Sequence, residues 1–194
     1  MRFQGKVAIV TGASLGIGKA TSEALAQEGA RVVLASRDPE SGQKAATAIT
    51  DRGGEVVFAS TDVSREEECR ALIDRAVGLY GRLDILVNNA GVYLQGDAKS
   101  TSQADWNRVL AINLTGAFLC TKYAIPAMVR SGGGVIVNVS SEAGLTGIKG
   151  QVAYNVSKGG LVALTRSSAV DLAEWGIRVN CVCPGTTDTP LVRE

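Results

Sequence analysis

Short apolar runs alternate with longer segments of helical period along this chain of 194 residues. Most of the runs are continuously apolar, which is typical of parallel strands that are covered on both faces. They predict strands at residues 7–10, 31–35, 55–59, 83–87, 134–138 and 177–182. The segments between them predict helices at residues 17–28, 39–52, 66–80, 103–129 and 153–174.

Repeated strand-then-helix units with short connections predict an α/β fold. We expect a Rossmann-like, doubly wound parallel sheet with helices on both faces. No linker or repeat divides residues 1–194, so a single domain is expected. Local capping signals support three helix starts: Asp38 before Pro39, Ser64 with Glu67, and Ser102 with Asp105. Proline disrupts helix interiors, so Pro126 is expected to kink or end the fourth long helix.

Composition excludes several classes of function. The formal net charge of +1 and the absence of a basic run give no basis for binding nucleic acid or anionic lipid. No run approaches the roughly 18 apolar residues of a membrane span, and the N-terminus does not resemble a signal peptide. A cytoplasmic location with no membrane partner is therefore expected.

The sequence offers few side chains that could bind a metal ion. The chain has no histidine, and its four cysteines are spread out, so no metal centre is expected. Cys181 and Cys183 lie at strand spacing in an apolar run and are interpreted as small buried hydrophobes. Unpaired thiols also suit a reducing compartment.

A glycine-rich segment joins the first predicted strand to the first predicted helix. It contains Gly12, Gly16 and Gly18, with Ser14 and Ile17 between them. Glycines allow a tight turn and a close approach to a pyrophosphate, and a helix N-terminus offers free N–H groups to phosphates. Its place in a strand–turn–helix unit favours a dinucleotide site over a purely geometric turn.

The Gly-x3-Gly-x-Gly spacing resembles the cofactor loop of the short-chain dehydrogenase/reductase family. Asp62-Val63 is similar to that family's adenine-contacting pair, and Asn88-Asn89-Ala90-Gly91 to its fourth-strand motif. The resemblance covers nearly the whole chain. It implies that Asp62, Val63, Asn89, Ala90 and Gly91 contact a nicotinamide dinucleotide.

The end of the second predicted strand favours NADP(H) over NAD(H). An acid there binds the ribose 2′-hydroxyl of NAD, whereas an arginine accommodates the 2′-phosphate of NADP. This chain has Ser36 at that place, followed by Arg37. Two residues leave NAD open: Leu15 stands where many NADP-preferring relatives have a second basic residue, and Asp38 could reach a ribose hydroxyl.

Tyr154 and Lys158 lie four residues apart on a predicted helix and so share one face. An ammonium beside a phenol lowers the phenol's pKa, which suits general acid–base catalysis. Ser141 follows the fifth predicted strand and can hydrogen-bond a substrate oxygen. Ser140 is adjacent, but the spacing to Tyr154 and the following Gly144 favour Ser141. Asn113 is a poor mid-helix residue among apolar neighbours.

The family resemblance assigns roles to these positions. Tyr154 would donate or accept the proton, and Ser141 would orient the carbonyl or hydroxyl group. Lys158 would also bind the nicotinamide ribose, and Asn113 would complete a proton relay through a water. Beside the nicotinamide, the resemblance places Pro184, Gly185, Thr187 and Thr189.

The expected function is hydride transfer between NAD(P)(H) and a small-molecule carbonyl or alcohol. The residues Tyr93, Glu142, Lys149 and Gln151 are expected to rim the substrate pocket, and their polarity favours a hydroxylated substrate. Alternatives are a non-catalytic nicotinamide sensor or scaffold, an interaction protein, and an epimerase or dehydratase. The resemblance also implies a dimer or tetramer if the chain is complete. Residues 191–194 fall where the family's substrate-covering helices begin, so a truncated chain without full activity is a further possibility.

Overall fold

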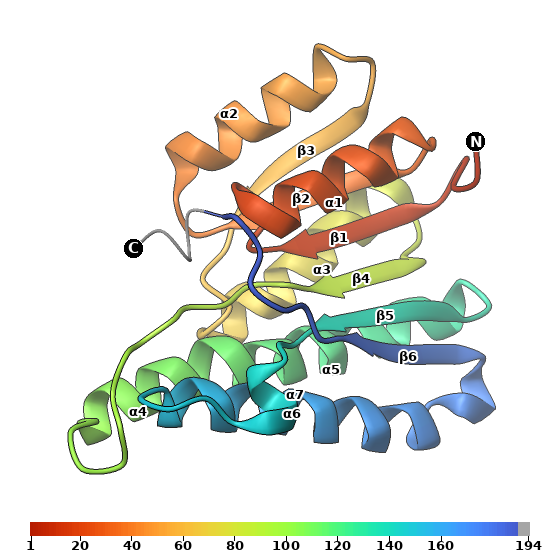
Figure 1. Cartoon of the computed structure of the whole chain (residues 1–194). Coiled ribbons are helices and arrows are strands. Elements are labelled where there is room, and N and C mark those ends of the chain that lie inside the picture. The colour runs from red at the N-terminus through yellow and green to blue at the C-terminus, as the bar shows by residue number, and fades with distance from the viewer. Residues whose placement is uncertain (190–194) are drawn as a thin grey trace.

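The computed structural model describes residues 1–189 as a three-layer arrangement of helices around one parallel sheet (Figure 1). The six strands lie in the order β3-β2-β1-β4-β5-β6. Their bounds are β1 Val7–Thr11, β2 Arg31–Ser36, β3 Glu55–Ser60, β4 Ile85–Asn88, β5 Gly134–Val139 and β6 Ile177–Val182. All registers are parallel, which confirms the doubly wound α/β prediction.

Helices cover the two faces of the sheet in separate groups. Their bounds are α1 Gly16–Gln27, α2 Pro39–Thr50, α3 Glu66–Tyr80, α4 Gln103–Leu110, α5 Gly116–Arg130, α6 Ala143–Thr146 and α7 Val152–Asp171. α1 and α2 pack on one face, whereas α3 and α5 pack on the other together with the C-terminal end of α7. The central strand β1 is fully buried because it lies between both groups.

The strand order reverses between β1 and β4, because β2 and β3 lie on one side of β1 and β5 and β6 on the other. Loops leave the carboxyl ends of neighbouring strands in opposite directions at such a point, which opens a crevice there. Asp84 fixes the opposite edge of the same two strands. Its carboxylate accepts hydrogen bonds from Val7 N at 3.0 Å, Lys6 Nζ at 3.0 Å and Arg82 Nη2 at 2.6 Å.

The predicted fourth long helix is continuous but irregular. A π-helical segment, η1 (Ala111–Thr115), joins α4 to α5, and Asn113 lies within it. Pro126 does not end α5, which continues to Arg130. The proline is exposed, so the carbonyl that loses its helical partner lies on the solvent side.

This joined helix, Gln103–Arg130, is the one described helix that is long and apolar enough to cross a membrane by length and composition. The expectation of no such segment is corrected to that extent. The helix serves as a core helix, because Cys120, Ala124 and Met128 are buried in the cluster that joins α3 and α5 to the sheet.

Two capping predictions are confirmed and one is wrong. Asp38 accepts from the N–H groups of Glu40 and Ser41, and Ser102 Oγ accepts from Asp105 N at 3.0 Å. Ser64 is not a cap, because its hydroxyl donates to Asp62 Oδ1 at 2.7 Å and α3 begins after Arg65 instead.

The two strand thiols also differ from the prediction. Cys181 and Cys183 are partly exposed rather than buried, whereas Cys69 and Cys120 are fully buried. The side of β6 that carries the thiols is only partly covered by α7, because β6 is the edge strand of the described sheet.

Candidate active site

A crevice of about 400 Å³ opens at the carboxyl ends of β1, β2, β4 and β5. Most of the residues predicted to bind a dinucleotide line it: Gly12, Ser14, Gly16, Ile17, Arg37, Asp62, Val63, Asn89, Ala90, Gly91, Tyr154, Lys158 and Thr189. Six predicted site residues do not line it: Gly18, Asn113, Ser141, Pro184, Gly185 and Thr187. The crevice therefore brings residues from both halves of the sheet together.

The glycine segment passes so close to the loop after β4 that side chains are excluded. A Cβ on Gly12 would lie 2.7 Å from Ala90 Cα, and one on Gly18 would collide with the Asn89 side chain. Gly12 and Gly16 also have positive φ angles of 62° and 53°. Gly18 thus acts by allowing close packing behind the crevice, which explains why it does not line the crevice itself.

Asn89 holds the glycine segment in place. Its side-chain amide donates to the carbonyl groups of Thr11 and Gly12, both at 2.9 Å. The Thr11 hydroxyl accepts in turn from the N–H groups of Asn89 and Ala90, both at 3.1 Å. These bonds connect β1 to β4 across the point where the strand order reverses. Sequence reasoning predicted a contact to the cofactor at Asn89 but missed this bracing role.

The N-terminus of α1 faces the crevice without a capping side chain. Leu15 at the N-cap position provides none, and no acidic residue lies in the first turn. The free N–H groups and the positive end of the helix dipole therefore remain available to an anion. Together with the glycine clearance, this arrangement fits the pyrophosphate of a dinucleotide.

Two charged residues follow β2: the cation Arg37, and Asp38, whose carboxylate caps α2. Arg37 is exposed and lines the crevice, and its charge contributes to lowering the pKa of Asp62. The main causes at Asp62 are burial, which raises the pKa, and the Ser64 hydroxyl and N–H, which lower it. Asp38 also lines the crevice, but its carboxylate caps α2. Ser36 is buried, and its hydroxyl donates to the Asp38 carbonyl at 3.2 Å.

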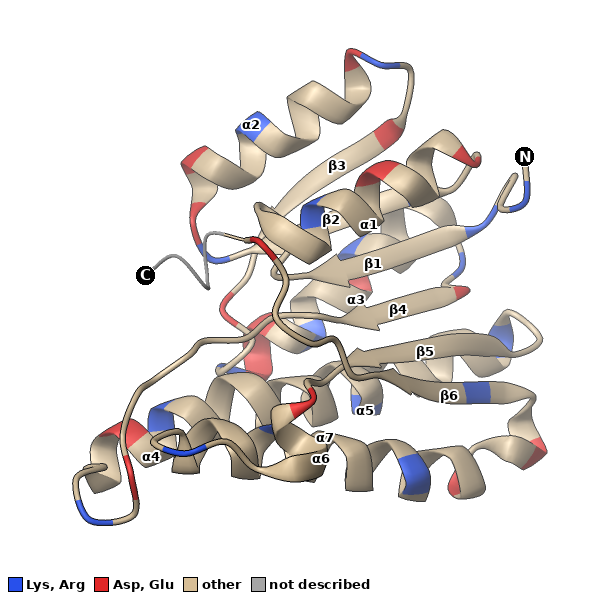
Figure 2. Cartoon of the chain, viewed as in Figure 1, with Lys and Arg blue, Asp and Glu red and all other residues tan. Residues whose placement is uncertain are grey.

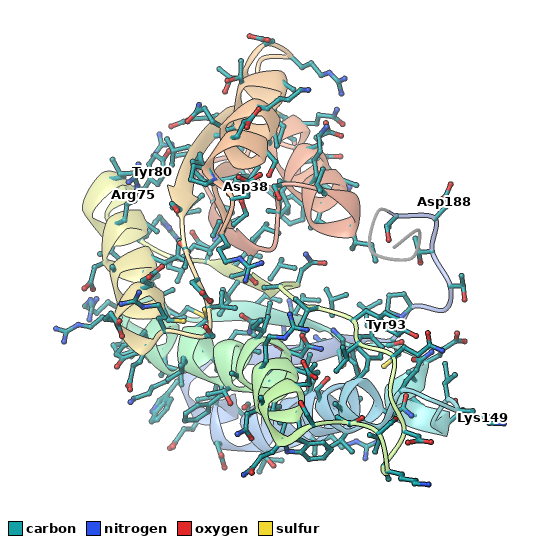
Figure 3. The ribbon with its side chains drawn as sticks, turned by 90° about the vertical axis from the view of Figure 1, so that its left-hand side faces the viewer. Asp38, Arg75, Tyr80, Tyr93, Lys149 and Asp188 are labelled. Atoms are coloured by element: carbon teal, nitrogen blue, oxygen red, sulfur yellow. The ribbon has the colours of Figure 1, made fainter. Side chains whose placement is uncertain are left out.

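On the other side of the crevice, α7 carries Tyr154 and Lys158. Burial raises the pKa of Tyr154, a hydrogen bond with Ser141 lowers it, and Tyr93 raises it. The Tyr93 ring packs edge-on against Tyr154 with the ring centroids 5.6 Å apart. Figure 3 shows Tyr93 and Asp38 on different halves of the molecule.

The expectation that Lys158 lowers the pKa of Tyr154 is not met in this structure. Burial lowers the pKa of Lys158 itself to about 8, although the Cys181 and Cys183 thiols act in the opposite direction. Its Nζ donates to the Val139 carbonyl at 2.8 Å and lies 5.7 Å from the centroid of the Tyr154 ring. Burial thus disfavours the charged form of Lys158, and its hydrogen bond goes to a backbone carbonyl instead of to Tyr154.

The two adjacent serines have different surroundings. Ser140 is buried, and its hydroxyl donates to the Lys158 carbonyl at 2.8 Å. Ser141 is partly exposed, its Oγ accepts from Ala143 N at 3.2 Å, and it shares a hydrogen bond with Tyr154. Ser140 therefore holds β5 against α7, while the Ser141 hydroxyl lies beside the phenol.

Asn113 is buried, and its amide is fully occupied. It donates to the Val92 carbonyl at 2.9 Å and to Ser157 Oγ at 3.0 Å, and it accepts from Val92 N at 2.8 Å. The asparagine therefore ties the loop after β4 to α7, next to Tyr154 and Lys158. The π-helical segment provides the local reason for a residue of poor helix propensity at this position.

The loop after β4 and the loop before α7 contact each other. A parallel bridge joins Gly96 to Gln151, with Gly96 N donating to Gly150 O at 2.7 Å. This bridge connects the segment that carries Tyr93 to the start of α7. Lys149 lies at the outer edge of the molecule in Figure 3, away from the crevice. Of the four residues expected to rim the substrate pocket, only Tyr93 has a described contact with Tyr154.

Comparison with known proteins agrees with this geometry. The family model described as short chain dehydrogenase matches residues 6–194. An uncharacterized oxidoreductase of Thermotoga maritima is 48% identical over 189 residues, which are 97% of this chain and 74% of that protein. A cis-4-hydroxycyclohexanecarboxylate dehydrogenase of Sinomonas cyclohexanicum is 45% identical, over 98% of this chain and 76% of its own length.

Solved structures show the same fold. A xylitol dehydrogenase with bound NAD⁺ has a TM-score of 0.92 and 39% identity, covering 95% of this chain and 72% of its own. A levodione reductase has a TM-score of 0.95 and 36% identity, covering 98% of this chain and 75% of its own.

Proposed function

We propose, from the premise that this chain belongs to the short-chain dehydrogenase family, that Tyr154 is the general acid and base of its reaction. The chain is an oxidoreductase that acts on an alcohol or carbonyl group with a nicotinamide cofactor. The carrying observation is the placement of the Tyr154 and Ser141 hydroxyl groups side by side, next to the crevice that Tyr154 and Lys158 line. The alternatives of a sensor, a scaffold and an interaction protein are set aside.

The proposed roles follow from what each side chain contacts. The nicotinamide, when bound, supplies or accepts the hydride. Tyr154 gives a proton to the carbonyl oxygen in the reducing direction and takes it back in the oxidising direction. Ser141 donates a hydrogen bond to the same oxygen and so shares its developing charge. Asn113 and Ser157 hold the loop after β4 against α7 and so position the tyrosine.

Removing the phenol hydroxyl tests the assignment. Tyr154→Phe keeps the ring and its packing against Tyr93 but removes the proton, so kcat is expected to fall by roughly 10²- to 10⁴-fold. Cofactor binding, followed by the fluorescence of the reduced nicotinamide, should change little. Tyr123→Phe is the matched control and should leave kcat unchanged, because the Tyr123 hydroxyl donates to Glu66 on the surface and does not line the crevice. An unchanged kcat in Tyr154→Phe would contradict the proposal.

We propose NADP(H) as the preferred cofactor, held at its 2′-phosphate by Arg37. Support comes from Asp38, whose carboxylate is held at the start of α2 by the N–H groups of Glu40 and Ser41. Ser36 carries no charge to repel a phosphate. Pro184, Gly185, Thr187 and Thr189 remain proposed contacts of the nicotinamide half.

Titration with NADPH and NADH separates the two cofactors. Arg37→Ala should weaken NADPH binding by about tenfold or more, since a charge-assisted hydrogen bond contributes roughly 1.5–3 kcal/mol. NADH binding should be unaffected, because it lacks the 2′-phosphate. Equal affinity of the wild type for both cofactors would overturn the Arg37 assignment.

The substrate class is proposed to be a hydroxylated or cyclic secondary alcohol and its ketone. Related proteins are named for hydroxycyclohexanecarboxylate, cyclohexanol and xylitol. Glu142 is exposed, and its N–H donates to the Pro184 carbonyl at 3.0 Å, which places it beside the proposed nicotinamide segment. A Glu142→Ala variant whose selectivity between polar and apolar ketones is unchanged would count against a role for this carboxylate.

Assembly and location are also proposals. Several apolar side chains are exposed on α5, at the end of α7 and in the 3₁₀ turn that follows it: Phe118, Val129, Val170 and Trp175. Burial of such side chains against a second copy would favour a homodimer or homotetramer, which sedimentation velocity would measure. Figure 2 shows both signs of charge spread over the ribbon, which gives no support for a nucleic-acid or membrane partner. A cytoplasmic location stays a prediction.

A further inference from the structure

Two thiols lie side by side where β6 ends. Cys181 is the last residue but one of β6, and Cys183 directly follows the strand. Their Sγ atoms are 3.9 Å apart. Residues two apart in an extended chain project to the same side, which explains the close approach. Both cysteines are partly exposed. No role in the proposed reaction uses either of them.

The thiol pair lies next to the proposed catalytic residues. Cys181 shares a hydrogen bond with Thr165 of α7, and both thiols interact electrostatically with Lys158. Cys183 directly precedes Pro184, whose carbonyl accepts from the N–H of Glu142 at 3.0 Å. A group held by the two sulfurs would therefore lie between Lys158 and the segment that is proposed to face the nicotinamide.

The sulfur separation favours a bridging atom over a disulfide. A disulfide needs the sulfurs about 2.05 Å apart, so each end would have to move considerably. Two thiolates on one tetrahedral zinc-sized centre, with bonds of about 2.3 Å, lie roughly 3.8 Å apart.

The number of donors selects the kind of bridging atom. Among residues 1–189, no group of three or more histidine, cysteine or acidic side chains could hold a metal ion. A zinc ion, which takes four ligands, would find only two here. A soft three-coordinate centre that already carries one organic substituent needs only two sulfurs, and soft centres prefer thiolates.

We propose that Cys181 and Cys183 form a dithiol site for soft three-coordinate electrophiles of the trivalent organoarsenical class. An arsenoxide R–As=O reacts with both thiols to give a cyclic dithioarsenite and one molecule of water. Two As–S bonds form, the arsenic–oxygen bonds break, and both thiol protons leave on the oxygen. Arsenic remains trivalent and neither sulfur is oxidised, so no further oxidant or reductant is needed.

Intact-mass spectrometry under non-denaturing conditions tests the site directly. Phenylarsine oxide is added to the reduced, desalted chain at a stoichiometric amount. The expected product carries one phenylarsenic group in place of two thiol hydrogens. Excess 2,3-dimercaptopropanol should remove it, whereas an equal concentration of 2-mercaptoethanol should not. This readout needs neither cofactor nor substrate, so its result is independent of the proposed oxidoreductase function.

Serine variants show whether both sulfurs are needed. Cys181→Ser and Cys183→Ser should each weaken the adduct by roughly 100-fold or more, the loss expected when an intramolecular second contact is removed. Cys120→Ala is the matched control and should keep the adduct, because Cys120 is fully buried elsewhere, in contact with Cys69.

The proposal is overturned if the folded wild type forms no adduct, or if the adduct persists in Cys183→Ser. Peptide mapping of the wild-type adduct keeps the test decisive even if a serine variant fails to fold. Arsenic found on the peptide that contains both Cys181 and Cys183 supports the site, and arsenic found on Cys69 and Cys120 overturns it. Loss of NADPH binding in the loaded chain would add that the site communicates with the crevice.

Discussion

Lys158 is the residue at which burial and charge conflict most strongly. Its side chain is almost fully buried on α7, and Nζ has a single described hydrogen-bond acceptor, the Val139 carbonyl. Burial without a carboxylate partner disfavours the ammonium, which lowers the pKa to about 8. A ribose hydroxyl of a bound dinucleotide would offer the amine a second partner. Such a contact would offset part of the cost of burying the charge.

This cost predicts a pH-dependent gain in stability for Lys158→Met. Below pH 8 both the folded and the unfolded chain carry the proton, and folding bears the full penalty, on the order of 3 kcal/mol. As the pH rises from about 8 toward 10.5, the folded chain releases the proton first and the penalty shrinks. Cofactor-free Lys158→Met should therefore unfold at higher urea than the wild type at pH 7, and this advantage should decrease by pH 10.

The matched control is Lys122→Met, because Lys122 is exposed and paired with Glu66 on the surface. It should show no such gain at pH 7. A Lys158→Met variant that is less stable than the wild type at pH 7 would mean that the Val139 hydrogen bond outweighs the burial of the charge.

At the same scale, some site residues could be predicted from the sequence and others could not. The positions of Tyr154, Lys158 and the glycines follow from local spacing, and Tyr154, Lys158, Gly12 and Gly16 line the crevice. Spacing also favoured Ser141 over Ser140, and the fold adds a physical reason, because the Ser140 hydroxyl is bonded to the Lys158 carbonyl. The direction of the Tyr154 pKa shift was predicted wrongly because burial is invisible in spacing.

Among the described elements, α6 is the shortest α-helix and packs closely on α7. It spans Ala143–Thr146, and sequence periodicity could not find it because four residues give barely one turn. A Cβ on Gly144 would lie 2.6 Å from the Lys158 carbonyl carbon. This clearance sets the distance between the segment that carries Ser141 and the helix that carries Tyr154.

Gly144→Ala is therefore expected to separate α6 from α7 and to displace Ser141 from Tyr154. Backbone atoms must move to accept the methyl group, so we predict a loss of roughly 1–3 kcal/mol in the free energy of unfolding. A misplaced hydroxyl should also lower kcat by about 10²-fold. Urea unfolding and steady-state turnover measure the two effects.

Gly78→Ala is the matched control on α3. A Cβ there would meet nothing within 4 Å, and the residue lies inside a helix without a positive φ angle. Alanine should stabilise the chain by roughly 0.5–1 kcal/mol and leave turnover unchanged. Equal behaviour of the two alanine variants would show that the α6–α7 clearance does not matter.

Element boundaries depended on contacts from outside each element. The cap at Asp38 was predictable because Pro39 and the capping carboxylate are adjacent in sequence. Ser64 does not cap α3, because its hydroxyl donates to Asp62 instead. The π-helical segment within the long helix has no sequence periodicity of its own, and its stabilising bonds run from Asn113 to Val92 and Ser157. Local signals thus predicted element type well and irregularities poorly.

For the whole molecule, the alternation of apolar runs with helical segments predicted the parallel sheet correctly, and the central strands β1 and β2 are buried on both faces as expected. What the alternation could not predict is how evenly the helices cover the sheet. In the described part of the chain, α1 and α2 lie over β1 to β3, and no helix covers the same face of β5 and β6 (Figure 1). A groove of about 440 Å³ remains there, lined by Val135, Val137 and Val182 among others.

The crevice spans both halves of the sheet, so one ligand should stabilise both. The proposed phosphate-binding part belongs to the β1–α1 connection, and the proposed reacting part to β5 and α7. At an NADPH concentration of about 100 times Kd, binding adds roughly 2.7 kcal/mol to the stability of the folded state. Amide hydrogen exchange shows where this stabilisation appears.

We predict slower exchange in peptides that cover Gly12–Gly18 and in peptides that cover Ser140–Lys158 when NADPH is added. The first group responds because the pyrophosphate binds the free N–H groups at the start of α1. The second responds because the nicotinamide ribose reaches Lys158, and Arg37→Ala should reduce both effects together at a fixed NADPH concentration. Protection confined to the first group would mean that the dinucleotide does not reach Tyr154, and the proposed catalytic arrangement would fail even though the glycine segment binds phosphate.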